Sequence, residues 1–195
     1  LEGGDILFHC GDITVRGFLA EVRQFAQYIS RQPFSHKVVI AGNHDFCFEN
    51  EKKDEAEKIL NDYGIIYLND SFVKIQGLKI WGSPIQPCFH NWAFNRQRGE
   101  EIKKHWDLIH DDIHVLLTHG PPHGLLDKIS TGESVGCEEL LKKVAQIKPH
   151  IHVFGHIHES YGTKRVDTTS FINCCVTDFR YWIRNRPIHV EYVEN

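Results

Sequence analysis

The hydrophobic positions in the first part of the chain follow two alternating patterns. An apolar run over 6–10 stops at Gly11 and Asp12, which is typical of a buried strand that leads into a loop. The apolar residues after it recur every three or four positions, as on one face of a helix. They are Leu19, Val22, Phe25, Ala26 and Ile29. A second apolar run over 37–41, followed by a charged helical pattern over 51–62, repeats the plan and predicts parallel strands joined by helices.

The middle of the chain changes to short apolar runs separated by pairs of turn residues. The runs cover 65–68, 72–75 and 78–81, and the turn residues lie at 69–70 and 76–77. Closely spaced strands with two-residue turns are typical of antiparallel hairpins, so we expect the three runs to pair in this way.

Helical and strand-like patterns alternate again in the second half. We expect helices over 99–109 and 137–147, strands over 114–118 and 150–154, and β-rich stretches over 161–176 and 188–193. No repeat, low-complexity tract or Pro/Gly-rich linker divides the chain, so we expect one domain over 1–195. The predicted fold class is α/β (α+β by some schemes), a two-sheet β-sandwich of mixed sheets with a parallel centre, antiparallel edges and helices outside.

Composition and charge narrow the class of protein. With 41% hydrophobic and 25% charged residues among 195, the chain can form a proper core. No run reaches the ~18 to 20 consecutive apolar residues of a membrane span, so we expect no membrane partner. The net charge of −4 comes without a Lys/Arg stripe, which argues against a strong nucleic-acid patch. Six cysteines without a Cys-x-x-Cys pair favour reduced thiols in a cytoplasmic protein.

Four of the predicted strands end on polar residues beside a glycine or a turn. Because the carboxyl ends of strands in open α/β sheets lie at one edge, these residues can meet in space although they are far apart in sequence. The polar residues concerned are Asp12, Asn43, His119, His156 and His158.

One carboxylate, one amide and three imidazoles make a ligand set for a divalent metal. Nitrogen and oxygen donors of this kind suit Mn, Fe, Zn, Co or Ni and are poor for Ca. Asp12 could bridge two cations through its two oxygens. Two metals ~3.5 to 4 Å apart would bind phosphoryl oxygens and activate a water, which is the chemistry of phosphoester hydrolysis.

His44 follows the candidate ligand Asn43 directly, so its ring should lie near the substrate rather than on the metal. There it could stabilise developing phosphoryl charge or protonate the leaving oxygen. Asp45 could orient this ring through one of its nitrogens. We therefore predict catalytic roles for His44 and Asp45.

Simpler interpretations compete with each functional one. A single Asp at a strand end usually caps a turn, and a single His is usually structural, but the spacing of the whole set favours a metal. The remaining histidines are expected at the surface or in the core, except that His123 could face the site. Several aromatic residues could form a nucleobase pocket or simply pack in the core. They are Phe46, Phe48, Trp81, Phe89, Trp92 and Phe94.

The ordered motifs resemble those of a known superfamily. Gly11-Asp12, Gly42-Asn43-His44-Asp45, Thr118-His119-Gly120-Pro121-Pro122 and Gly155-His156-Ile157-His158 are similar to the motifs of the calcineurin-like metallophosphoesterases. Within these, the chain looks most like the small metallophosphoesterase-domain-containing phosphodiesterases. The resemblance implies a pair of mixed sheets flanked by helices and a dinuclear metal centre. Manganese is the metal that we expect there.

The resemblance also implies a role for each candidate residue. Asp12 would bridge two metals, and Asn43, His119 and His156 would complete one site. His158 would bind the second metal, while His44 and Asp45 match the substrate-stabilising pair of the superfamily.

One motif of the superfamily is missing from the printed sequence. An Asp-x-His motif, whose side chains help to hold the second metal, normally precedes Gly-Asp, but none precedes Asp12. The chain therefore has one full ligand set and one half set. Because it begins at Leu1 and contains no Met, we expect a trimmed domain that lacks its first strand and this motif.

These observations predict an enzyme that hydrolyses phosphoesters with a metal-activated water. Phosphodiesters, including cyclic nucleotides, are the expected substrates, so the expected partner is a small phosphoester such as a nucleotide. The alternatives are a phosphomonoesterase, or a metal-binding regulatory module that has lost catalysis. The sequence contains no phosphate loop, serine-hydrolase elbow or His-Glu-x-x-His helix that would support another mechanism, and it does not predict the oligomeric state.

Overall fold

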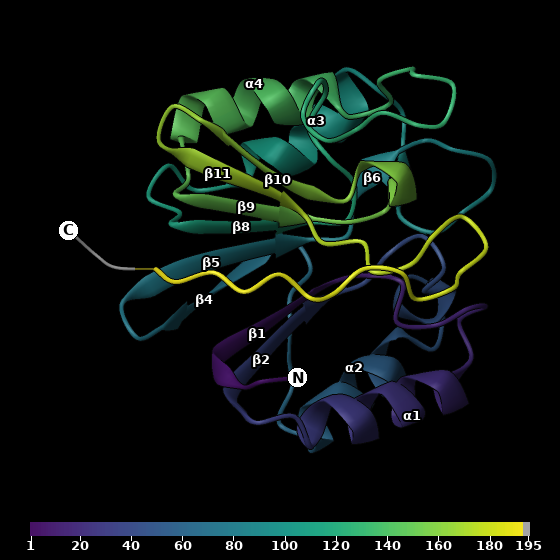
Figure 1. The fold of residues 1–195 in the computed structure, drawn as a ribbon. Helices are drawn as coiled ribbons and strands as arrows, with labels where there is room; N and C mark the ends of the chain where they lie inside the picture. Colours follow the sequence, from purple (N-terminus) through teal and green to yellow (C-terminus); the bar gives the residue numbers. More distant parts are fainter. Residues whose placement is uncertain (193–195) are drawn as a thin grey trace.

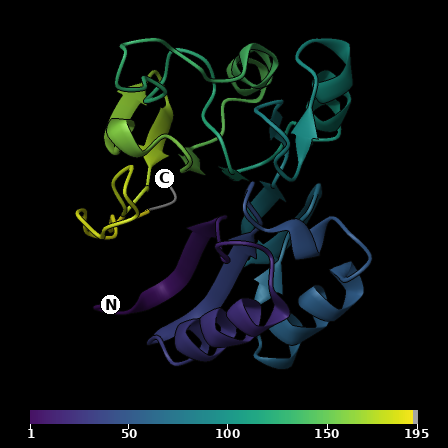
Figure 2. The ribbon, with the colours of Figure 1, turned by 90° about the vertical axis from the view of Figure 1, so that its right-hand side faces the viewer.

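Two β-sheets pack face to face, and helices cover the outer face of each (Figure 1). The structure is a computed structural model and describes residues 1–192. Helices α1 (Leu19–Ser30) and α2 (Lys53–Asp62) lie on the smaller sheet, whereas α3 (Glu100–Asp107) and α4 (Glu138–Ile147) lie on the larger one (Figure 2). The predicted sandwich of sheets flanked by helices is confirmed.

The smaller sheet contains three parallel strands in the order β1-β2-β3. Strands β1 (Gly4–Cys10) and β2 (Phe34–Ile40) pair in parallel up to Cys10 opposite Ile40, as predicted. Strand β3 (Ile66–Tyr67) extends the sheet in parallel beside β2. The expected antiparallel pairing of the run over 65–68 is therefore wrong, because the chain crosses to the other sheet after β3 instead of turning back.

The larger sheet has the order β10-β11-β9-β8-β5-β4. Its inner pairs are parallel and its two outer pairs are antiparallel, as the sequence predicted. Positive φ angles of 50° at Gln76 and 85° at Gly77 form the tight turn of the β4–β5 hairpin. The strands are β4 (Ser71–Ile75), β5 (Leu78–Ser83), β8 (Val115–Thr118), β9 (Ile151–Phe154), β10 (Gly162–Val166) and β11 (Thr169–Asn173). Short elements complete the fold: η1 (Phe46–Phe48), β6 (Gln86–Pro87), β7 (Asn95–Arg96) and η2 (His158–Ser160).

Alternation along the strands separates the core between the sheets from the core under the helices. In β8, Val115 and Leu117 pack with Ile40 of β2 between the sheets, whereas Leu116 packs on the helical side. Because both sheets contribute to the inner cluster, the ends of their strands are held at a fixed relative position. Among residues 1–192, no helix has the length and apolar character that crossing a membrane would need.

The C-terminal part is less regular than the sequence suggested. A bridge between Thr177 and Ile183 closes a small loop, which we call the C-terminal hairpin (177–183). The β-rich stretch expected over 188–193 forms no strand within 188–192, and position 193 lies outside the described residues. Ile188 and Tyr192 instead pack their side chains against the core between the sheets.

Candidate metal centre

Three of the predicted ligands meet at the carboxyl ends of their strands. Asp12 follows β1, His119 follows β8 and His156 follows β9, so the cluster joins both sheets. One ligand atom of each residue lies within 4.8 Å of the others. The expectation that polar strand ends converge is therefore met for these residues.

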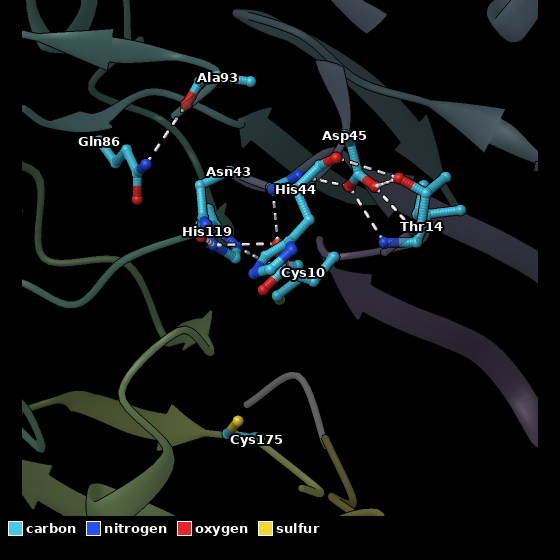
Figure 3. Close-up of polar contacts among 12 residues, drawn as sticks. Cys10, Thr14, Asn43, His44, Asp45, Gln86, Ala93, His119 and Cys175 are labelled. Atoms are coloured by element: carbon cyan, nitrogen blue, oxygen red, sulfur yellow. Dashed lines mark hydrogen bonds and ion pairs between the residues drawn. The ribbon is translucent and has the colours of Figure 1, made fainter. Parts of the chain in front are cut away.

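The two ring nitrogens of His119 face different groups: one faces a backbone carbonyl, and the other faces two side-chain oxygens. Its Nδ1 lies 2.8 Å from the carbonyl oxygen of Cys10 (Figure 3), which can only accept, so Nδ1 carries the ring proton. The other ring nitrogen, Nε2, faces Oδ1 of Asn43 at 2.8 Å and Oδ1 of Asp12 at 3.6 Å. Three candidate ligand atoms thus face one another. A divalent cation would satisfy all three, so the residues present fit a metal.

Two glycines allow this close packing of ligands. A Cβ at Gly42 would come within 2.5 Å of both Oδ1 of Asp12 and the His119 ring, and a Cβ at Gly11 would meet Nδ1 of His119 at the same distance. The ligands Asp12 and His156 themselves adopt left-handed backbone conformations, with φ of 58° and 66°. Non-glycine residues adopt this region at an energetic cost that is typical of functional sites.

Asp12 and His156 have the protonation states that a metal requires. Burial lowers the pKa of His156 to about 3, and the neighbouring His119 adds to the effect. Burial alone would raise the pKa of the Asp12 carboxyl, but nearby histidines, led by His119, outweigh it and hold this pKa below its ordinary value. At neutral pH the Asp12 carboxylate is therefore charged and the His156 imidazole is neutral.

His44 lies beside the cluster with its ring fixed on several sides. Its backbone N–H donates to Oδ1 of Asp12 at 3.2 Å, and its Nδ1 donates to the carbonyl oxygen of Val15 at 2.9 Å. The Tyr181 hydroxyl lies 3.2 Å from Nε2, and the Trp92 ring packs at 4.4 Å between centroids. Nε2, which is turned towards Tyr181, is therefore the ring nitrogen that no backbone group holds.

Asp45 does not orient His44 in the way the sequence suggested. Its two carboxylate oxygens accept the backbone N–H groups of Ile13, Thr14 and Gly42 at 2.7 to 3.0 Å. The Thr14 hydroxyl donates to it as well (Figure 3). The Val15 carbonyl accepts the hydrogen bond from the His44 ring instead. Asp45 therefore acts by joining the loops after β1 and β2. Burial, with the nearby Asp12 charge, raises the pKa of Asp45 to about 6.

His158 lies next to the C-terminal hairpin. Its Nδ1 donates to the carbonyl oxygen of Asp178 at 2.7 Å, and the Tyr181 ring lies between His158 and His44, with centroids 5.5 and 5.7 Å away. Hydrogen bonding to Cys175, together with the Asp178 carbonyl, raises the pKa of His158 to about 9. Its role as ligand of a second metal stays a prediction.

The aromatic candidates divide between core and site. Phe48, Trp81 and Phe94 are buried. Phe46 stacks on Trp92 beside His44, and the Phe89 and His156 ring centroids lie 6.3 Å apart.

Two other expectations concern His123 and the cysteines. Nδ1 of His123 lies 3.8 Å from Oδ2 of Asp127. All six cysteines are free thiols, as expected.

Sequence reasoning missed the groups that fix the two key imidazoles. The carbonyls of Cys10 and Val15 carry no signal in their side chains, so no motif could have found them. Tyr181 is 137 positions from His44 and lies outside every motif.

The comparisons with known proteins show which family the chain belongs to. The family model described as calcineurin-like phosphoesterase matches residues 1–160. The chain belongs to the calcineurin-like phosphoesterase family. All of the predicted ligands and both predicted catalytic residues lie within the matched range.

Curated relatives in this family match nearly the whole chain. Metallophosphoesterase domain-containing protein 1 of Homo sapiens is 39% identical over 96% of this chain and 64% of its own length. UPF0046 protein T07D4.2 of Caenorhabditis elegans is 39% identical over 96% of this chain and 54% of its own length. The chain thus spans less than two thirds of these relatives.

Two solved structures share the fold of this chain at low sequence identity. The protein TT1561 of Thermus thermophilus matches with a TM-score of 0.60 and 12% identity, covering 88% of this chain and 77% of the other. Another crystal structure matches with a TM-score of 0.62 and 17% identity, covering 83% and 65%. At these identities the match establishes the fold alone.

Proposed function

We propose that this chain hydrolyses phosphoesters with the help of a divalent metal ion held by Asp12, Asn43, His119 and His156. The observation that carries the proposal is that Nε2 of His119 lies 2.8 Å from Oδ1 of Asn43 and 3.6 Å from Oδ1 of Asp12. Mn, Fe, Zn, Co and Ni suit this donor set. Membership of the calcineurin-like phosphoesterase family supports the proposed metal-dependent hydrolysis. When bound, such a metal neutralises phosphoryl charge and lowers the pKa of a bound water.

His44 is the proposed substrate-contacting residue of this chain. With Nδ1 held by Val15, its Nε2 is the nitrogen that can reach a ligand, and the Tyr181 hydroxyl already occupies a hydrogen-bonding position there. A phosphoryl or leaving-group oxygen would replace this hydroxyl. A proton on Nε2 could then pass to the leaving oxygen. Trp92 would keep the ring in place by packing on its face.

A second metal between Asp12 and His158 is the finer part of the proposal. Because Nδ1 of His158 donates to Asp178, its Nε2 remains available for a cation once the extra ring proton is released. Asp45 would contribute by holding the loops that carry Asp12 and His44 in place.

We also propose that the chain forms a single domain, which the core shared by both sheets supports. We propose further that it is cytoplasmic, which its free thiols support.

Phosphodiesters, including cyclic nucleotides, are the proposed substrates. Chain loaded with Mn²⁺ should be assayed on bis-p-nitrophenyl phosphate and on p-nitrophenyl phosphate at equal concentration, with Asn43→Ala as the metal-site control. We expect faster release from the diester and loss of both reactions in the variant. Faster release from the monoester would contradict the diester preference and favour a phosphomonoesterase. Metal binding without hydrolysis of either ester would contradict the enzyme and favour a regulatory module.

A further inference from the structure

Large apolar side chains are unusually exposed on two segments beside the candidate metal centre. In the C-terminal hairpin, Phe179, Trp182 and Ile183 expose 67%, 65% and 78% of their surface. In the loop after β1, Val15 and Phe18 expose 67% and 57%. Figure 1 shows the purple loop after β1 and the yellow hairpin on the same side of the molecule, at the right of the view.

Both segments are anchored on the same imidazole. The loop after β1 reaches it through the Val15 carbonyl, and the hairpin reaches it through the Tyr181 hydroxyl. His44 therefore contacts both segments, and the exposed side chains belong to segments that adjoin the proposed reaction centre. We call this surface the apolar rim and define it as Val15, Phe18, Phe179, Tyr181, Trp182 and Ile183.

The hairpin holds its exposed side chains in a defined arrangement. The backbone N–H groups of Arg180 and Trp182 both donate to Oδ1 of Asp178, at 2.9 and 3.1 Å. The Arg184 side chain donates to Oδ2 of the same carboxylate at 3.0 Å. This network presents the apolar tip to solvent at the cost of leaving it unburied, which is typical of a surface that meets a partner.

The charged residues beside the rim are mostly positive, although the chain as a whole carries −4. Arg16 lies between the two apolar residues of the loop after β1, and Arg180 and Arg186 are exposed on or just after the hairpin. Two acidic residues lie beside them: Asp178 is paired with Arg184, and the Glu21 carboxylate accepts the backbone N–H groups of Val15 and Phe18. A partner for this surface should therefore offer apolar material beneath a layer of negative charge.

We propose that the apolar rim docks on the surface of a membrane that contains anionic phospholipid. Tyr and Trp side chains favour the boundary between headgroups and acyl chains, and arginines near them gain from the negative surface potential. Docking would bring the metal centre to the phosphodiester of a lipid headgroup. The naming of a lipid substrate rests on the proposed function, whereas the docking itself does not. The proposal departs from the expectation of no membrane partner, which rested on the lack of a spanning segment; peripheral docking needs no such segment.

Vesicle sedimentation without metal or substrate tests the docking directly. The chain should be mixed with vesicles of phosphatidylcholine, either alone or with about one third phosphatidylserine. The tryptophan fluorescence of each mixture should be recorded as well, to follow Trp182. We expect binding to the anionic vesicles, with a blue shift that is absent in Trp182→Phe. Phe179→Ser and Trp182→Ser should each weaken binding roughly tenfold or more. Arg180→Gln should weaken it roughly fivefold, and added salt should weaken it further.

The matched control is Tyr28→Ser, which removes a side chain that is 59% exposed in the last turn of α1. It should bind vesicles like the unaltered chain. No binding to anionic vesicles, or equal losses in Tyr28→Ser and Trp182→Ser, would overturn the proposal. So would self-association without vesicles that Trp182→Ser abolishes, since a second copy would then cover the rim. Normal vesicle binding with no hydrolysis of a soluble diester would instead contradict the proposed function and leave the docking intact.

Discussion

Nε2 of His119 faces the side-chain oxygen of Asn43 at 2.8 Å, while the other nitrogen of the same ring donates to the Cys10 carbonyl. The arrangement leaves a lone pair opposite an acceptor, which is unfavourable unless a cation or a proton lies between them. This contact links two sequence motifs to the proposed chemistry. Asn43 follows β2 of the smaller sheet, and His119 follows β8 of the larger sheet.

A metal should therefore stabilise the folded chain. At a Mn²⁺ concentration 100 times the dissociation constant, the free energy of unfolding should rise by about 2.7 kcal/mol, seen as a higher melting temperature. Asn43→Ala should lose most of this rise, whereas a variant of an exposed histidine, His189→Ala, should keep it. An equal rise in both variants would mean that the metal binds elsewhere.

Gly42 should tolerate no side chain. A methyl group at this position would meet Asp12 and His119 at 2.5 Å, so Gly42→Ala should displace the ligands and reduce metal affinity by roughly tenfold or more. Gly120→Ala is the matched control, since nothing lies within 4 Å of a Cβ there. Isothermal titration with Mn²⁺ measures both; unchanged affinity in Gly42→Ala would be inconsistent with the described site.

Removal of the His44 side chain should affect turnover and not metal content. The ring contacts Val15 and Tyr181 through its two nitrogens, while the contact with Asp12 comes from the backbone N–H and survives the change. His44→Ala should therefore lower kcat for a diester by about 10² to 10⁴-fold. Metal analysis of the same sample provides the control, and loss of the metal would refute the assigned role.

Asp45 should prove important for stability. Both of its oxygens accept hydrogen bonds, so an amide in either orientation would turn its NH₂ group towards other donors. Asp45→Asn should lower the free energy of unfolding by about 2 to 4 kcal/mol in urea at neutral pH. Thr14→Val, which removes a single hydroxyl donor to this carboxylate, should cost about 1 kcal/mol. Equal stability of Asp45→Asn and the unaltered chain would contradict this structural role.

Acid should destabilise the chain partly through His152. Burial lowers the pKa of this histidine to about 3, whereas the unfolded chain takes up its proton near 6.5. Stability contributed by the neutral ring is therefore complete above pH 6.5 and falls as the pH drops towards 3, by up to about 1.4 kcal/mol per pH unit. His152→Gln should flatten the dependence by this amount between about pH 5.5 and 4, measured by urea unfolding. An unchanged slope would show that His152 is not the source.

Much of the fold was predictable because one periodicity dominated each segment. The apolar face of α1 and the turn of the β4–β5 hairpin follow from local spacing and from Gln76-Gly77. The partner of the run around Ile66 was not predictable, since parallel pairing with Val38 depends on where the chain crosses between sheets. Strand identity is a local property, whereas strand partnership is not.

The candidate site divides in the same way. Asp12, His119 and His156 could be proposed as neighbours because the carboxyl ends of strands were expected to meet, although the preceding strands belong to two sheets. The role of Asp45 was misjudged because adjacency to His44 in sequence suggested contact between side chains. In the structure, backbone groups of another loop satisfy each of them, and such contacts leave no trace in residue type.

Metal content after equilibrium dialysis is the most direct test of the central claim, that strand-end residues of both sheets hold a divalent cation. Chain dialysed against Mn²⁺ and then analysed for bound metal should retain at least one ion. Asp12→Asn and His156→Ala should retain none at the same free concentration while remaining folded. Absence of bound metal in the unaltered chain, or equal metal in all three proteins, would contradict this claim.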